Sequence, residues 1–166
     1  MRPRARRLLA YGIALGVIAL DQFTKAWISR TIPLGGRIEI LPIFNLTCLH
    51  NRGAAFSLLG DGGAAANTLF LVLAAAATVF FTVWIWRNGR RSGTLPPIAL
   101  GLILGGTMGN GIDRIRHGYV VDFIQVHVGG WYYPAFNVAD SALTVGAVLL
   151  ILAYLRPAPG EARTDH

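Results

Sequence analysis

The stretch Leu95–Ile112, "LPPIALGLILGGTMGNGI", decides the fold that we expect of this chain. It carries no charged side chain, and roughly 20 mostly apolar residues are enough to cross the hydrocarbon core of a bilayer. Gly101, Gly105 and Gly109 recur within it at intervals of four, so they share one helical face. Small residues on one face let helices approach closely in lipid. The stretch therefore predicts a central, closely packed membrane-spanning helix.

The composition of the whole chain also indicates a membrane protein. Of its 166 residues 54% are hydrophobic and only 14% are charged, and the mean hydropathy is +0.51. Three further stretches are long and apolar enough to span a bilayer, at about residues 8–27, 66–86 and 138–155. The last includes polar residues at its start because its purely apolar run is short. We predict a mainly α membrane protein with four transmembrane helices.

A cleaved signal peptide is the alternative for the first span. "MRPRARR" has the character of a basic n-region and "LLAYGIALGVIAL" that of an apolar h-region. However, no small-x-small cleavage site follows, and apolar residues resume at Phe23, Ala26 and Trp27. We therefore interpret residues 8–27 as a retained span.

The arginine residues predict the orientation of the spans. They gather before the first span, between the second and third, and after the fourth: Arg2, Arg4, Arg6, Arg7, Arg87, Arg90, Arg91 and Arg156. By the positive-inside rule both termini are cytoplasmic, and residues 28–65 and 113–140 face outward. The formal net charge of +7 is thus assigned to topology and to contact with membrane lipid, not to nucleic acid. We expect a single domain over residues 1–156 and a disordered cytoplasmic tail over 157–166.

The two outward segments are expected to form a small β-sheet. Arg37–Asn51 is rich in β-branched and aromatic residues and is interrupted by Pro42, which predicts short edge strands. Tyr119–Tyr133 has two β-prone arms about Gly129–Gly130, which predicts a hairpin. We expect an extracytoplasmic β-sheet platform on the outer membrane face, with Trp131–Tyr133 at headgroup depth.

Two carboxylates in these segments are candidates for catalysis. Asp122 lies within the β-prone run "YVVDFIQV", and Asp140 follows in "FNVAD", where the chain re-enters the membrane. Brought together by the turn between them, two carboxylates tend to share one proton. Such a pair can hydrolyse a peptide, because one activates water while the other protonates the carbonyl oxygen. The structural alternative is that Asp122 is a solvated strand residue and Asp140 a helix N-cap.

Further polar residues are predicted on the same membrane face. A charge at membrane depth costs about 2.5–3.5 kcal/mol, so each one needs a partner or a purpose. Asp21 and Lys25 are four residues apart and are expected to form an ion pair. In "NRGAAF" the small side chains leave room for another chain to lie close, although a plain turn remains the alternative. The other candidates for binding or support are Asn51, Arg52, Gly53, Ala54, Asn110, Asp113, Arg114 and Asn137.

Other chemistries have less support in the sequence. Cys48, the sole cysteine, excludes an internal disulfide, and only His50 lies near enough in sequence to activate it as a nucleophile. The histidines are too dispersed for zinc, so we expect no metal and no cofactor. A proton- or ion-conducting subunit is the alternative from another class, but no acidic residues cross the bilayer midplane. A presenilin-like protease would need Gly-x-Gly-Asp, where "LLGDGG" has Leu58. A structural protein would leave the paired carboxylates unexplained.

Five short motifs follow one another between Leu8 and Leu155. They read "DQFTK" (Asp21–Lys25), "NRGAAF" (Asn51–Phe56), "GGTMGNGIDR" (Gly105–Arg114), "VVDF" (Val120–Phe123) and "FNVAD" (Phe136–Asp140). Each motif is weak alone, but five in this order are highly specific. In them the chain resembles the lipoprotein signal peptidases, also called type II or prolipoprotein signal peptidases.

The resemblance implies an aspartic endopeptidase of the bacterial inner membrane, with its active site near the outer face. The implied substrates are prolipoproteins with a diacylglyceryl group on cysteine, cleaved just before that cysteine, and the implied inhibitor is the cyclic peptide globomycin. Asp122 and Asp140 match the catalytic aspartates of the family. The other matched polar positions would line or support the pocket: Asp21, Asn51, Asn110, Asp113, Arg114 and Asn137.

Overall fold

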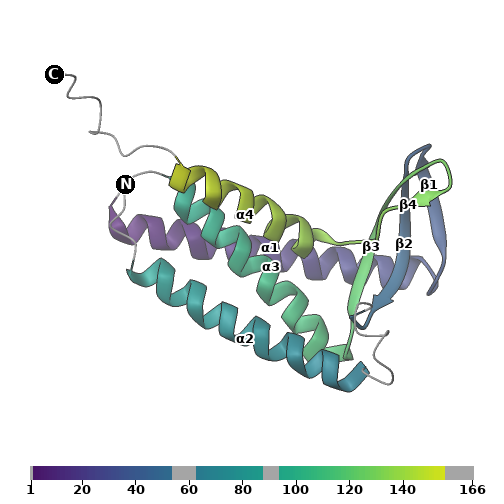
Figure 1. Cartoon of the computed structure of the whole chain (residues 1–166), viewed down its shortest axis with the longest axis horizontal. Helices are drawn as coiled ribbons and strands as arrows, with labels where there is room; N and C mark the ends of the chain where they lie inside the picture. Colours follow the sequence, from purple (N-terminus) through teal and green to yellow (C-terminus); the bar gives the residue numbers. More distant parts are fainter. Residues whose placement is uncertain (1, 54–62, 88–93, 156–166) are drawn as a thin grey trace.

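The computed structural model describes residues 2–53, 63–87 and 94–155, and within them it has four helices and a small sheet at one end of the bundle (Figure 1). The elements are α1 (Pro3–Thr31), β1 (Arg37–Leu41), β2 (Phe44–Asn51), α2 (Gly63–Arg87), α3 (Leu95–His117), β3 (Val120–Val128), β4 (Trp131–Tyr132) and α4 (Val138–Leu155). Each helix is long and apolar enough to cross a membrane. The predicted fold class, a membrane protein with four spanning helices and a small sheet, is confirmed.

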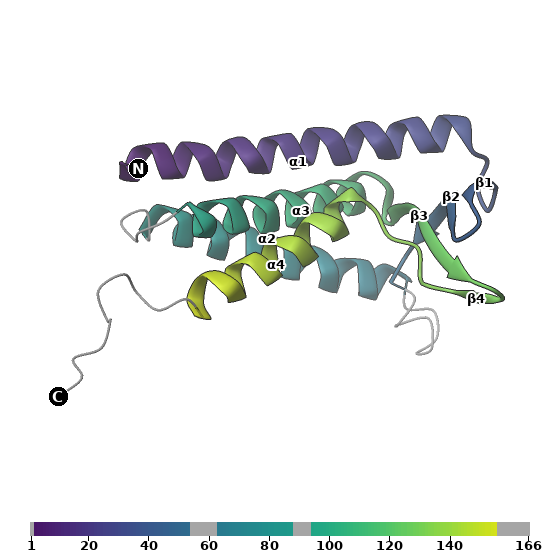
Figure 2. The ribbon, with the colours of Figure 1, turned by 90° about the horizontal axis from the view of Figure 1, so that it is seen from above.

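Helix α3 occupies the centre of the bundle, as its sequence predicts. In its most apolar window 56% of the residues are buried, against 22% in α1, 6% in α2 and 17% in α4. The other three helices each pack mainly against α3, and the two ribbon views show it flanked by them (Figures 1 and 2). The outer helices therefore present most of their apolar surface to the surroundings, as expected of spans in contact with lipid.

Glycines make this close packing possible. A Cβ atom added to Gly101 would lie 2.5 Å from the carbonyl oxygen of Ala10 in α1, and one added to Gly105 would lie 2.8 Å from a carbonyl oxygen one turn further on. On another face of α3, a Cβ atom on Gly106 would collide with the carbonyl oxygen of Ala139 in α4. Backbone atoms cannot move aside unless a helix shifts, so a larger residue would separate the helices. The packing interpretation of the glycine pattern is confirmed.

Helices α1 and α3 extend by four or more residues beyond the spans that hydropathy predicts. The spans were expected at 8–27 and 95–112, whereas the helices cover Pro3–Thr31 and Leu95–His117. Hydropathy marks the apolar length, but backbone hydrogen bonds continue a helix through polar residues as well. Helix α3 stops where Gly118 takes a left-handed conformation, with φ of 75°, which glycine adopts at little cost. The outer turns of both helices therefore carry polar residues toward the sheet.

The sheet is antiparallel, with the strand order β1-β2-β3-β4. Two-residue turns join β1 to β2 at Pro42–Ile43 and β3 to β4 at Gly129–Gly130, and Gly129 has a φ of 57°. The predicted Gly-Gly hairpin is therefore confirmed. The prediction of edge strands is right for β1 but wrong for β2, which pairs with β1 on one side and β3 on the other. Pro42 lies in the turn, so it removes no donor from the β2 ladder.

The C-terminal end of α1 supports the sheet. Ile28 and Ile32 are buried against Cys48 of β2 and against Val121 and Phe123 of β3. Full burial of a large apolar side chain contributes about 1.5–3 kcal/mol, so this cluster is a strong attachment. It fixes β2 and β3 to the same helix end that carries the polar "DQFTK" motif.

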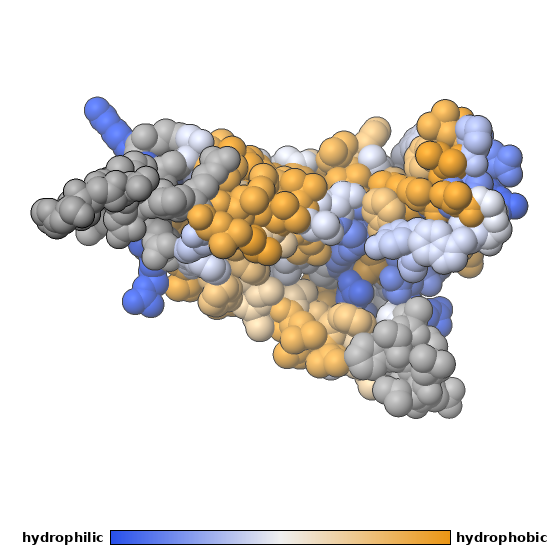
Figure 3. Space-filling view, turned by 45° about the horizontal axis from the view of Figure 1, so that its top comes forward, coloured by the Kyte–Doolittle hydropathy of each residue, from blue (hydrophilic) through white to orange (hydrophobic). Residues whose placement is uncertain are grey.

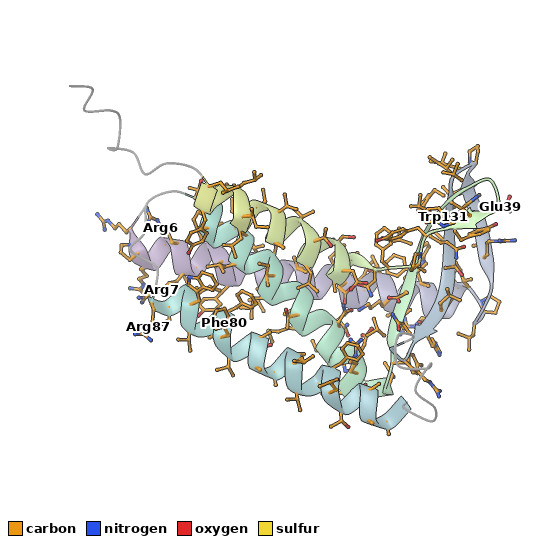
Figure 4. The ribbon with its side chains drawn as sticks, viewed as in Figure 1. Arg6, Arg7, Glu39, Phe80, Arg87 and Trp131 are labelled. Carbon is orange, nitrogen blue, oxygen red and sulfur yellow. The ribbon has the colours of Figure 1, made fainter. Side chains whose placement is uncertain are left out.

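Charge and apolar surface are separated along the length of the molecule. Figure 4 shows Arg6, Arg7 and Arg87 at one end of the bundle. Trp131 lies at the opposite end, exposed on the sheet, and much of the helix surface on the face shown in Figure 3 is hydrophobic (Figures 3 and 4). Arg7 joins α1 to α2, because it donates a 2.7 Å hydrogen bond to the carbonyl oxygen of Trp86 and lies 4.1 Å over its ring.

Gly101→Ala should destabilise the bundle, whereas Gly12→Ala should not. The new methyl group at position 101 meets the carbonyl oxygen of Ala10, and such overpacking costs roughly 1–3 kcal/mol. No atom lies within 4 Å of a Cβ atom on Gly12, where alanine gains about 0.5–1 kcal/mol of helix preference. Thermal unfolding of both variants in one detergent measures the difference. Equal melting temperatures would contradict the close contact of α1 with α3.

Candidate active site

The start of α4 holds one of the two candidate carboxylates. The side-chain oxygen of Asn137 accepts the N–H of Asp140 at 2.9 Å, and the Asp140 carboxylate accepts the N–H of Asn137 at 3.2 Å. This reciprocal pair is a capping box, which satisfies two N–H groups that a helix start leaves free. The structural alternative that made Asp140 the N-cap is therefore wrong, because Asn137 is the cap. Asp140 lies in the first turn, where a carboxylate also interacts favourably with the helix dipole.

The second carboxylate, Asp122, is buried in β3 and held by two amides. Asn51 of β2 donates to one of its oxygens at 2.9 Å, and Asn137 donates to the other at 2.7 Å. The β2–β3 register shifts between Leu46 and Leu49, and this places Leu49 opposite Asp122. With only 3% of its surface exposed, Asp122 is not the solvated strand residue of the structural alternative.

Two amide side chains link the carboxylates. Asn137 donates to Asp122 through its side chain and to Asp140 through its backbone N–H. Asn110 of α3 donates to Asp140 at 2.7 Å, and its oxygen accepts from the Asn137 amide at 3.2 Å. The structure therefore brings together side chains from β3, α3 and the start of α4.

The surroundings of Asp122 suit it to acid–base chemistry. The pKa of Asp122 is raised to about 6, chiefly by burial and in part by the negative charge of Asp140. Hydrogen bonds from Asn51 and Asn137 and the positive charge of Lys25 act in the opposite direction. A carboxyl with a pKa near 6 exchanges its proton close to neutral pH, as a general acid or base must.

Behind the pair, Lys25 forms the centre of a buried ion network. Its Nζ lies 2.8 Å from Asp21 and 2.9 Å from Asp113, and it donates a 2.9 Å hydrogen bond to the side-chain oxygen of Asn110. The predicted ion pair of Asp21 with Lys25 is confirmed, and Asp113 is a second partner that spacing alone did not indicate. The Gln22 amide donates to both carboxylates, at 3.3 Å to Asp21 and 2.8 Å to Asp113.

Arg114 and Gly53 both contact Phe70 of α2. The Arg114 guanidinium lies 4.6 Å over the ring of Phe70 and interacts electrostatically with Asp140. Gly53 is buried against the same ring, and a Cβ atom there would lie 2.7 Å from it. Its φ of 92° suits glycine, and the Asn51 side chain accepts its N–H at 2.8 Å. Gly53, which follows β2, is therefore closely packed against α2.

Two of the predicted residues are not placed in this cluster by any described contact. Arg52 is exposed at the surface, and Ala54 lies outside the described residues. Conversely, Gln22 and Phe70 belong to this region but were not predicted from the sequence. Gln22 follows Asp21 within "DQFTK", so its place in the motif could have drawn attention to it. Phe70 is one aromatic residue among several in α2, and no local signal distinguishes it.

The described part of the chain offers a carboxylate site without a metal cluster. Among those residues, no group of three or more His, Cys, Asp or Glu side chains could hold a metal ion. Paired carboxylates, one with a raised pKa, are the groups that acid–base hydrolysis of a peptide requires.

Comparisons with known proteins identify the family. The family model described as "Signal peptidase (SPase) II" matches residues 13–156. The chain belongs to the signal peptidase II family. It is 46% identical over 149 residues to the lipoprotein signal peptidases of Burkholderia thailandensis and Burkholderia mallei, a match that covers 90% of this chain and 89% of each relative. Identity to the lipoprotein signal peptidase of Paraburkholderia phymatum is 44%.

Two solved structures share the signal peptidase II fold seen here. Both are described as bacterial membrane enzymes determined by the in meso method, at 1.9 Å and 2.3 Å resolution. Their TM-scores are 0.78 and 0.77 at 32% and 31% identity, covering 90% and 95% of this chain and 94% and 93% of theirs. The signal peptidase II family cleaves signal peptides from prolipoproteins, so this chain is a multi-pass membrane protease, and the resemblance found in its motifs is confirmed.

The stability of this signal peptidase II chain should carry a pH-dependent contribution from Asp122. Its pKa is raised from 3.8 to about 6, so the folded state holds this proton more tightly than the unfolded state. The stabilisation that this proton gives to the folded state is therefore fully present below about pH 4 and is lost as the pH rises through about 6. The corresponding decrease in the free energy of unfolding is on the order of 2–3 kcal/mol.

Asp122→Asn lacks this titration, whereas Asp140 and Lys25 are present in both proteins. The melting temperature of wild type minus that of Asp122→Asn should therefore fall between pH 4 and pH 7. Thermal unfolding of the two proteins in detergent across this range measures it. A difference that stays constant with pH would contradict the raised pKa.

Proposed function

We propose that this chain is an aspartic endopeptidase whose catalytic dyad is Asp122 and Asp140. The observation that carries the proposal is the linkage of these two carboxylates through Asn137 and Asn110 at the junction of β3, α3 and α4. Burial and the neighbouring charge allow the pair to hold one proton between them near neutral pH. Membership of a protease family supports a hydrolytic role for such a pair.

The dyad would hydrolyse the peptide bond without a covalent intermediate. The ionised carboxylate takes a proton from a water molecule, and the water oxygen forms a bond to the scissile carbonyl carbon. The protonated carboxyl gives its proton to the carbonyl oxygen, which yields a neutral diol. The C–N bond then breaks, the amine leaves with the proton taken from water, and the second hydroxyl returns its proton to the dyad. One water molecule is consumed, and the pair regains its single proton.

The neighbouring amides suit this cycle. Asn51 and Asn137 donate to Asp122, and Asn110 donates to Asp140, so an ionised form of either carboxylate is stabilised although it lies out of water. Amides carry no charge of their own and do not titrate, so they orient the pair without competing for its proton.

We propose diacylglyceryl-modified prolipoproteins as the substrates, cleaved just before the lipidated cysteine. Asp122 lies in β3 and Asp140 in the first turn of α4, and these two elements meet where the helix bundle joins the sheet (Figure 1). A bond presented at this depth reaches the carboxylates while the acyl chains of the substrate remain in membrane lipid. Globomycin, as a cyclic peptide, would compete for the same pocket.

Asp122→Asn and Asp140→Asn should each abolish cleavage, because an amide cannot accept or transfer the shared proton. The double variant should be little worse than either single variant, since the dyad acts as a unit. The measurement is the gel shift of a diacylated prolipoprotein incubated with purified enzyme in detergent. Asn51→Ala is a useful companion, because it should reduce the rate without abolishing it. Substantial cleavage by either Asp→Asn variant would exclude the dyad.

We further propose that the protein lies in the bacterial inner membrane with both termini in the cytoplasm. The support is the position of Arg6, Arg7 and Arg87 at the end opposite the sheet (Figure 4), where the positive-inside rule requires them. The dyad then lies near the outer face, and the sheet is extracytoplasmic.

The activity of a reporter fused to this protein should therefore depend on the position of the fusion. Fusions after Arg91 or His166 should be active as cytoplasmic reporters, and insertions at Gly35 or Gly129, in turns of the sheet segments, as extracytoplasmic reporters. The paired use of a reporter active only inside and one active only outside controls for expression. A cytoplasmic reading at Gly129 would place the dyad on the wrong side of the membrane.

A further inference from the structure

Each hydrogen of the Lys25 ammonium group has an acceptor in the structure. An ammonium group has three donors, and Lys25 meets Asp21 at 2.8 Å, Asp113 at 2.9 Å and the Asn110 side-chain oxygen at 2.9 Å. Lys25 and Asp113 are 3% exposed and Asp21 is fully buried. Opposite charges are thus held together out of water, between α1 and α3.

One carboxylate of this network holds the backbone beside Asp140. The Oδ1 atom of Asp21 accepts the N–H of Ala139 at 2.9 Å, while its Oδ2 atom faces Lys25. Ala139 immediately precedes Asp140 in the first turn of α4. The charge on Lys25 thereby fixes the carboxylate that anchors the start of this helix.

The other carboxylate holds the backbone beside Asp122 in the same way. The Oδ2 atom of Asp113 accepts the N–H of Val121 at 3.2 Å and also faces Lys25 at 2.9 Å. Val121 immediately precedes Asp122 in β3. A single lysine therefore connects, through one carboxylate on each side, the backbone positions of both aspartates.

The third contact of Lys25 orients an amide toward the dyad. An ammonium group only donates, so the atom of Asn110 that faces it must be the oxygen. The NH2 group of Asn110 is then directed the other way, where it donates to Asp140 at 2.7 Å. The Asn137 amide donates to the same Asn110 oxygen at 3.2 Å, so loss of the cation would remove one of the two donors that hold the Asn110 amide in this orientation.

A purely stabilising role does not account for charges at these positions. Desolvation offsets most of the attraction within a buried ion network, and well-packed apolar residues often replace one without loss of stability. Apolar residues cannot accept the two backbone N–H groups or orient the amide. The feature that requires this network is therefore the geometry around the two aspartates.

We propose that Lys25 is a positioning residue that sets the distance and orientation of the two catalytic aspartates through the two carboxylates and the amide it binds. The inference rests on the proposed function, because it takes Asp122 and Asp140 as the catalytic pair.

Lys25→Met tests the inference through kinetic constants. Loss of the ammonium group should lower kcat about 10- to 100-fold, as expected when a supporting contact or a displacement of about 1 Å disturbs reacting groups. KM for the diacylated prolipoprotein should stay within about twofold, because Lys25 acts on the dyad and not on the substrate. The matched control is Gly101→Ala, which loosens the same α1–α3 interface but lies away from the network. It should lower the melting temperature yet keep kcat within about twofold where the protein is folded.

Variants of Asp113 test the same contact even if Lys25→Met fails to fold. Asparagine retains an oxygen that can accept the N–H of Val121, whereas leucine does not. Asp113→Asn should therefore keep at least about fivefold more kcat than Asp113→Leu at equal KM. Adding Asp113→Asn to Lys25→Met should cost little more, since both act through one contact.

The outcomes separate this inference from the proposed function. A wild-type kcat in Lys25→Met, an equal loss in Gly101→Ala, or equal kcat in the two Asp113 variants would overturn the positioning role and leave the dyad intact. Activity in Asp122→Asn would instead overturn the dyad itself. Inactive aspartate variants together with the predicted kcat losses would support both.

Discussion

The close approach of three helices at Gly109 is the constraint on which the rest of the structure depends. A Cβ atom at this position would lie 2.8 Å from the Asp21 carboxylate of α1 and 3.2 Å from Ala139 of α4. Only a residue without a side chain lets both helices meet α3 at this depth. The contact affects both the fold and the site, because the Asp21 carboxylate accepts a hydrogen bond from the N–H of Ala139 there. The packing of the helices at Gly109 therefore also sets the position of the candidate active-site residues at the start of α4.

The polar residues inside this packing are stable there because each one has a partner. Water cannot solvate groups at such depth, so an unpaired charge or amide would be costly. Lys25 contacts two carboxylates and an amide oxygen. Asn110 donates a hydrogen bond to Asp140, and Asn137 donates one to Asp122. The same dry surroundings raise the pKa of Asp122 to about 6. Burial thus both requires these side chains to be hydrogen-bonded and raises the pKa of Asp122.

The sheet contributes the second half of the site. Only Gly118, which is left-handed, and Tyr119 separate α3 from β3, and β3 is fixed to α1 by the apolar cluster of Ile28 and Ile32. Its neighbour β2 ends in Asn51, which reaches Asp122. A sheet packed on helix ends thereby places Asp122 out of bulk water, beside the start of α4.

The sequence by itself determined the spans, their packing helix, the hairpin and the family, because these follow from local patterns: apolar length, glycine spacing, a Gly-Gly turn and ordered motifs. It also placed Asp21 beside Lys25, since four residues make one helical turn. Only the tertiary structure decided that Asp113 shares Lys25, that Asn137 and not Asp140 caps α4, that β2 is an inner strand and that Phe70 packs against Gly53 and Arg114. These contacts join residues from different helices and strands. Their geometry depends on helix ends, register and amide orientation, which tertiary packing fixes and local sequence patterns do not encode.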